Sequence, residues 1–88
     1  MPALAQGAVT VTDTLGAVYD GADAVRLVVR NNSGSVTVYL GDSAVTAENG
    51  WPLFPGEGYE WPIRIDDRSA VYAVTDSGTA DVRWMTVT

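Results

Sequence analysis

The chain has 88 residues, of which 47% are hydrophobic, and 5 arginines against 11 Asp and Glu residues give it a formal net charge of -6. This length is that of one domain, and the hydrophobic content excludes a disordered acidic chain. Cysteine, histidine and lysine are absent, which excludes disulfides, zinc sites built on Cys or His, His-activated nucleophiles and Schiff-base lysines. We therefore expect a protein that is not an enzyme, with no catalytic residues, no metal and no cofactor.

The charge balance also indicates which classes of partner the chain can bind. The arginines are scattered among more than twice as many acidic residues, whereas binding to a phosphate backbone relies on clustered Lys and Arg. No apolar run is long enough to cross a bilayer, and the first residues lack the basic region and long apolar stretch of a signal peptide. We expect neither a nucleic-acid partner nor a membrane partner.

In chain order, residues 1–7 are small and apolar without a pattern, which predicts a flexible N-terminal arm ahead of a single domain over residues 8–88. The arm is either a frayed terminus or an extended segment that lies on a neighbouring subunit. Residues 8–12 alternate apolar and hydroxyl side chains, which predicts a half-buried strand, and residues 15–19 continue it past a kink. An acidic turn is expected over residues 20–23.

Residues 24–31 form the clearest predicted strand, because apolar and charged side chains alternate along it. Residues 31–35, rich in Asn, Ser and Gly, predict a turn, and residues 36–40 predict a second strand. Two alternating runs joined by a short turn predict a β-hairpin. Its outward face would be a solvated sheet face or a partner-binding surface, carrying Arg26, Arg30 and Tyr39.

Residues 41–58 are rich in Gly and Pro, which predicts a loop with at most one helical turn. Within it, Trp51, Leu53 and Phe54 lie in a segment that two prolines restrain, so little entropy is lost on binding. These three residues are therefore candidates for partner binding. The alternative is that Leu53 plugs the open end of the domain and that Trp51 or Phe54 covers it.

The remaining residues predict three more strands, over residues 59–65, 70–75 and 80–87, with Trp84 on the core-facing side of the last. Turns are expected at residues 66–69 and, as a second hairpin, at residues 76–79. No segment has sustained helical periodicity. The fold class is therefore all-β, a single small antiparallel β-sandwich or barrel of about six or seven short strands.

One pattern of strands, turns and an end-closing loop runs through five segments, which are residues 25–32, 38–41, 45–46, 50–57 and 71–83. Together they resemble the small β-sandwich structural proteins of tailed-bacteriophage virions, which include capsid decoration proteins and the bases of head or tail fibres. In such modules the Gly50, Leu53 and Gly56 segment looks like the loop that closes one end. The resemblance carries no catalytic residues.

The resemblance implies a bacteriophage virion structural protein, above all a capsid decoration protein bound to the outside of the major capsid shell. Its implied partners are the major capsid protein or other virion proteins, its implied state is a homotrimer, and its location is the virion, assembled in the host cytoplasm. Two alternatives stay open. One is a carbohydrate- or receptor-binding fibre or spike base, with Trp51, Trp61 and Trp84 as stacking platforms. The other is a tail or connector component.

Overall fold

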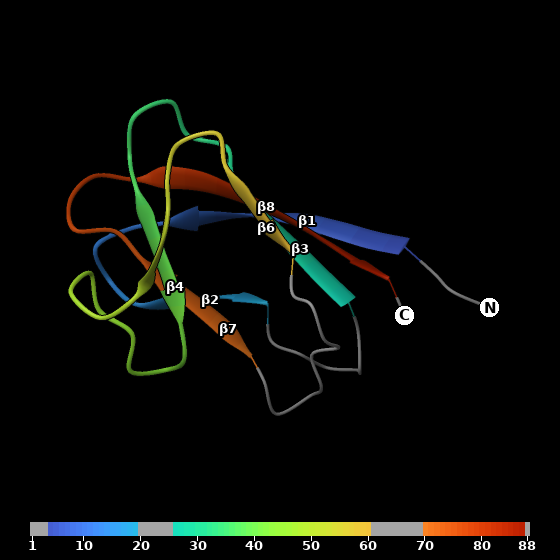
Figure 1. Cartoon of the computed structure of the whole chain (residues 1–88), viewed down its shortest axis with the longest axis horizontal. Helices are drawn as coiled ribbons and strands as arrows, with labels where there is room; N and C mark the ends of the chain where they lie inside the picture. The colour runs from blue at the N-terminus through green and yellow to red at the C-terminus, as the bar shows by residue number, and fades with distance from the viewer. Residues whose placement is uncertain (1–3, 20–25, 61–69, 88) are drawn as a thin grey trace.

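The computed structural model describes residues 4–19, 26–60 and 70–87, and within them the chain is all β. The strands are β1 (Leu4–Val11), β2 (Gly16–Tyr19), β3 (Arg26–Asn31), β4 (Val38–Gly41), β5 (Trp51–Leu53), β6 (Gly58–Glu60), β7 (Val71–Val74) and β8 (Ala80–Val87). They form a first sheet of order β1-β8-β3-β6 and a second of order β2-β7-β4-β5, both antiparallel (Figure 1). The predicted β-sandwich is confirmed, with more strands than expected because β5 lies in a segment predicted as loop.

The space between the sheets is filled by aliphatic side chains, because every second residue of the long strands faces inward. In β3, Leu27 and Val29 are fully buried while Arg26 and Arg30 are exposed, as the alternation predicted. The core cluster consists of Val11, Val18, Leu27, Val29, Val38, Leu40, Leu53, Val71, Ala73, Ala80 and Val82. Each buried Val or Leu stabilises the fold by about 1.5–3 kcal/mol relative to an exposed one.

Neither predicted hairpin exists. The connection after β3 crosses from the first sheet to β4 in the second, and the connection after β7 crosses back to β8 in the first (Figure 1). The turn residues are as expected, and Gly78 has a φ of 79°. A turn sequence reverses the chain, but the packing of two sheets decides whether the next strand pairs with the last or lies across the core from it.

The predicted N-terminal arm is corrected over residues 4–7, which are the first half of β1. Leu4 lies opposite Val87, and the register continues without a break to Val11 opposite Ala80. Gly7 faces Trp84, and the indole fills the space of the missing side chain, since a Cβ on Gly7 would stand 2.5 Å from the ring. Pairing with β8 therefore orders a segment that has little strand propensity of its own. Residues 1–3 lie outside the described residues.

Other expectations also lie outside the described residues. They are the acidic turn at 20–23, the strand segment at 61–65 with Trp61, and the turn at 66–69. Trp84, predicted on the core-facing side, is half-buried at the margin of the core, where its ring meets Tyr19 edge-on at 5.3 Å between centroids.

Candidate functional site

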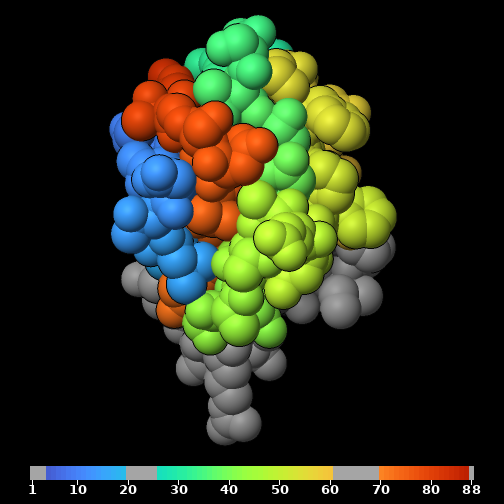
Figure 2. All heavy atoms as spheres, turned by 90° about the vertical axis from the view of Figure 1, so that its left-hand side faces the viewer, coloured from blue at the N-terminus to red at the C-terminus, as the bar shows by residue number. Residues whose placement is uncertain are grey.

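The two sheets end side by side at strands β5 and β6, and three aromatic residues lie in these strands or in the segment that joins them. Trp51 lies in β5, Tyr59 in β6 and Phe54 in the connection between them. Their part of the chain, yellow in Figure 2, lies on the side of the molecule away from the blue β1 and β2. Trp51 is 62% exposed and Phe54 is 54% exposed. We call Trp51, Phe54 and Tyr59 the aromatic flank.

Trp51 and Tyr59 meet across the gap between the sheets. Trp51 is opposite the buried Leu40 and Tyr59 is opposite the buried Val29, so both side chains start from the core-facing side of an edge strand. Their ring centroids are 5.9 Å apart, with 47° between the ring planes. Such tilted pairs add about 0.5–1.5 kcal/mol beyond the area they bury. Trp51 thus meets Tyr59 at the margin of the sandwich and keeps most of its surface exposed.

Phe54 is held by a tight turn. The Glu57 N–H donates to the Phe54 carbonyl oxygen at 2.9 Å, and Gly56, between them, has a φ of 84°. Pro55 followed by a glycine with positive φ defines a type II turn. The Glu57 carboxylate oxygen Oε1 also accepts a hydrogen bond from the Phe54 N–H at 2.9 Å. The exposed phenyl ring therefore stands on a backbone that is fixed at both its N–H and its carbonyl.

Asn31 anchors the aromatic flank from inside the molecule. Its side chain is fully buried, and Nδ2 donates to the carbonyl oxygens of Val36 at 2.7 Å and Leu53 at 2.8 Å. Its Oδ1 accepts from the Ser33 N–H at 3.0 Å, and its backbone N–H donates to the Glu57 carbonyl oxygen at 2.9 Å. One side chain thus ties the end of β3 to the entry of β4 and to β5. The sequence analysis placed Asn31 where a strand ends and a turn begins, and it missed this role.

The candidate residues of the loop divide into two kinds. Trp51 and Phe54 are exposed, whereas Leu53 is 2% exposed and belongs to the core. Leu53 pairs with Val38 in β4 and faces inward from β5. Its candidacy for direct partner contact is therefore corrected, and the alternative interpretation, that it fills the end of the domain, describes its position.

The other three candidates do not share a surface. Arg26 and Arg30 lie on the outer face of the first sheet, whereas Tyr39 lies in β4 of the second sheet, opposite Val74 and Pro52. The sequence grouped them because it took β3 and β4 as one hairpin. The structure brings Arg30 instead to Arg83, its register partner in β8.

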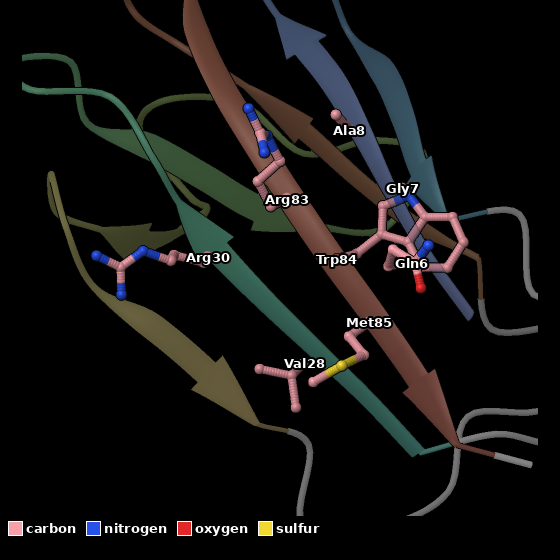
Figure 3. A pocket seen from close by; sticks show the side chains of 8 residues that line it. All are labelled: Gln6, Gly7, Ala8, Val28, Arg30, Arg83, Trp84 and Met85. Atoms are coloured by element: carbon pink, nitrogen blue, oxygen red, sulfur yellow. The ribbon is translucent and has the colours of Figure 1, made fainter. Parts of the chain in front are cut away.

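A groove on this outer face, missed by the sequence analysis, runs along β1, β8 and β3 and encloses about 540 Å³ (Figure 3). Its lining residues are Gln6, Gly7, Ala8, Val28, Arg30, Arg83, Trp84 and Met85. Arg83 forms an ion pair with Asp81 at 2.8 Å. The Arg83 side-chain hydrogen bonds, and then one from Asn32, hold the pKa of Asp81 below its ordinary range, and the same pairing raises the pKa of Arg83.

A smaller hollow of about 210 Å³ lies beside Trp51 and Tyr59, and Leu40 and Gly41 also line it.

In the described part of the chain, no group of three or more His, Cys, Asp or Glu side chains is placed to hold a metal ion. The described residues also include no helix long and apolar enough to cross a membrane. No protein-family model matches the chain, and no curated protein sequence matches it either.

Proposed function

We propose that this chain is a non-enzymatic structural protein of a virus particle, a decoration protein that binds the outside of a major capsid shell through its aromatic flank. The observation that carries the proposal is the exposure of two large aromatic rings, Trp51 and Phe54, on a fixed backbone. Trp is among the residues most enriched at binding hot spots, and aromatic residues as a class are enriched at the cores of interfaces.

The fixed backbone supports binding because little conformational entropy is lost when a partner docks. The type II turn at Pro55 and Gly56, the Glu57 hydrogen bonds and the buried Asn31 all hold the flank in one conformation before contact. A decoration protein needs only a modest contact in each copy, because many copies on a symmetric shell add their effects. The net charge of -6 suits an outer surface better than one that faces packaged nucleic acid.

The test is co-sedimentation of the purified protein with shells of the virus whose genome encodes it. We expect saturable binding, and we expect Trp51→Ala and Phe54→Ala each to weaken it by about 30-fold, the effect of losing a hot-spot side chain of about 2 kcal/mol. Leu15→Ala is the matched control, because Leu15 is also an exposed large hydrophobic residue, at 40%, but lies before β2. No binding by the wild type, or equal loss in the control, contradicts the proposal.

One observation favours a second candidate, a carbohydrate-binding module. Trp51 and Tyr59 present tilted rings around the hollow of about 210 Å³, a shape that suits a sugar ring stacked on an aromatic face. A glycan array separates the two functions. Saturable binding of a glycan that is lost in Trp51→Ala, without binding to shells, supports the carbohydrate function and contradicts the decoration function.

A further inference from the structure

The four edge strands of the sandwich differ in how they are protected from pairing with another strand. β5 has three residues and contains Pro52, β6 has three residues and ends at Glu60, and β2 has four residues with a register shift between Ala17 and Tyr19. Proline, charge, shortness and irregularity are the features by which natural sheets block their edges. Three of the four described edges therefore carry such a block.

The fourth edge, β1, has none of them. Its eight residues, LAQGAVTV, include no proline and no charged side chain, and its register against β8 is regular from end to end. Its only neighbour in the first sheet is β8, so among the described strands its other side is unpaired. At about 3.4 Å a residue this free edge is about 27 Å long. A regular, uncharged edge of this length is a ready template for another strand.

We propose that β1 pairs antiparallel with β1 of a second copy of this chain, which joins the two first sheets into one continuous eight-stranded sheet. A two-fold axis through the middle of β1 makes the contact self-complementary. The core-facing sides of the two copies lie on the same side of the joined sheet only if the residue numbers of each opposed pair add up to an even number. A centre at Gly7, for example, sets Gln6 against Ala8 and Leu4 against Thr10, with no charge opposed to another.

Charge distribution favours a second copy on this edge. Copies of a chain with a net charge of -6 repel one another over most of their surface. The aromatic flank adds to this repulsion, because Glu57 and Glu60 lie beside it. β1 carries no charge, and Arg83, opposite Ala8 on the outer face, is neutralised by its ion pair with Asp81. The β1 edge is therefore a side on which two copies approach with little like-charge repulsion.

The β1-paired dimer goes beyond the proposed function and does not depend on it. β1 and β6 are opposite edges of the first sheet, so pairing through β1 leaves an aromatic flank at each far end of the dimer. Such a dimer presents two equivalent surfaces, one at each end. It is two-fold, in place of the trimer that the resemblance implied.

The test is the mass of the free protein by light scattering at concentrations up to roughly 100 µM, above the Kd of an ordinary weak dimer. We expect twice the 9.3 kDa of one chain. The double variant Gln6→Lys with Ala8→Lys places lysines opposite one another in the dimer, and we expect it to weaken association by more than about tenfold. The matched control is Ser43→Lys with Ala44→Lys, which makes the same charge change on an exposed loop.

Hydrogen exchange on the unmodified protein gives a second readout. In the dimer, the β1 amides that point away from β8 are hydrogen-bonded, so their exchange slows as the protein concentration rises. The proposal is overturned if the wild type is a monomer or a trimer, or if β1 exchange does not depend on concentration. It is also overturned if the β1 lysines leave the dimer intact, or if the control pair weakens it equally. None of these results depends on whether the aromatic flank binds a capsid.

Discussion

The two flanks of this sandwich are built in opposite ways. At the aromatic flank the edge strands are short, interrupted by Pro52 and bounded by Glu60, and the gap between the sheets is covered by the rings of Trp51 and Tyr59. At the other flank, β1 runs for eight uncharged residues with regular pairing to β8. One flank is therefore suited to contact through side chains and the other to contact through the backbone.

The largest expected effect on stability comes from removing the Asn31 side chain, which anchors the aromatic flank. Asn31→Ala removes the hydrogen bonds to the Val36 and Leu53 carbonyl oxygens and leaves the buried Leu53 oxygen without this donor, whereas the Val36 oxygen keeps the Ser33 hydroxyl at 3.0 Å. We expect a loss of about 3 kcal/mol in the free energy of unfolding, because buried polar groups lose their partners. Chemical denaturation measures it. The neighbouring Asn32→Ala is the control, since Asn32 is exposed and its side chain donates to the Asp81 carboxylate at 3.1 Å.

For Asn32→Ala we expect a change within about 0.5 kcal/mol, as for most exposed positions. A domain of this size has a total stability of roughly 4–13 kcal/mol, so the loss at position 31 removes a large share of it. If the two variants are equally stable, Asn31 does not anchor the aromatic flank as its hydrogen bonds indicate.

A smaller effect on stability is expected at two glycines, one near each flank. A Cβ on Gly50, just before β5, would stand 2.6 Å from the Tyr39 Cβ and 2.9 Å from the Thr46 carbonyl oxygen, both close to or part of the backbone. We expect Gly50→Ala to destabilise the fold by about 2 kcal/mol, the cost of overpacking. In β2 of the opposite flank, Gly16 has nothing within 4 Å of its Cβ position.

Gly16→Ala should therefore be neutral or stabilising by up to about 0.5 kcal/mol, because alanine loses less backbone entropy than glycine on folding. Thermal unfolding of both variants measures the contrast. A Gly50→Ala protein with an unchanged melting temperature would show that the connection between β4 and β5 is loosely packed, and that the aromatic flank is not fixed from this side.

The smallest effect concerns pH and the outer face of the first sheet. Since the Arg83 hydrogen bonds lower the pKa of Asp81 from its ordinary 3.8, this carboxylate stabilises the folded state at pH values above 3.8. That contribution is lost as the pH falls through the lowered pKa. The denaturation midpoint of Asp81→Asn should therefore lie slightly below that of the wild type near neutral pH, and the two should converge in strong acid. A difference that grows toward low pH contradicts the sign.

Much of the fold could be predicted from local patterns. The alternation in β3 and β8 identified Leu27, Val29, Ala80 and Val82 as inward-facing, because the side-chain period of a strand is set by the backbone alone. The two hairpins were predicted wrongly, because the sheet that receives a strand depends on partners far along the chain. For the same reason, residues 4–7 read as an arm, although they pair with residues 84–87 in β8.

The candidate site was predicted in part. Aromatic residues next to prolines are a local signal, and Trp51 and Phe54, which carry it, are both exposed. Tyr59 completes the flank only because β5 and β6 lie in different sheets that end side by side, which the sequence does not display. Asn31 was missed because a buried asparagine at the end of a strand and a turn asparagine look alike until the acceptors, here Val36 and Leu53, are in place.

The proposed function requires that this protein binds through the aromatic flank. An electron-microscopy reconstruction of capsid shells saturated with the protein is the decisive experiment. We predict density in which Trp51 and Phe54 are covered by the shell while the β1 edge of each bound copy points away from it. A bound protein whose aromatic flank faces solvent, with the outer groove of the first sheet against the shell, would contradict the claim.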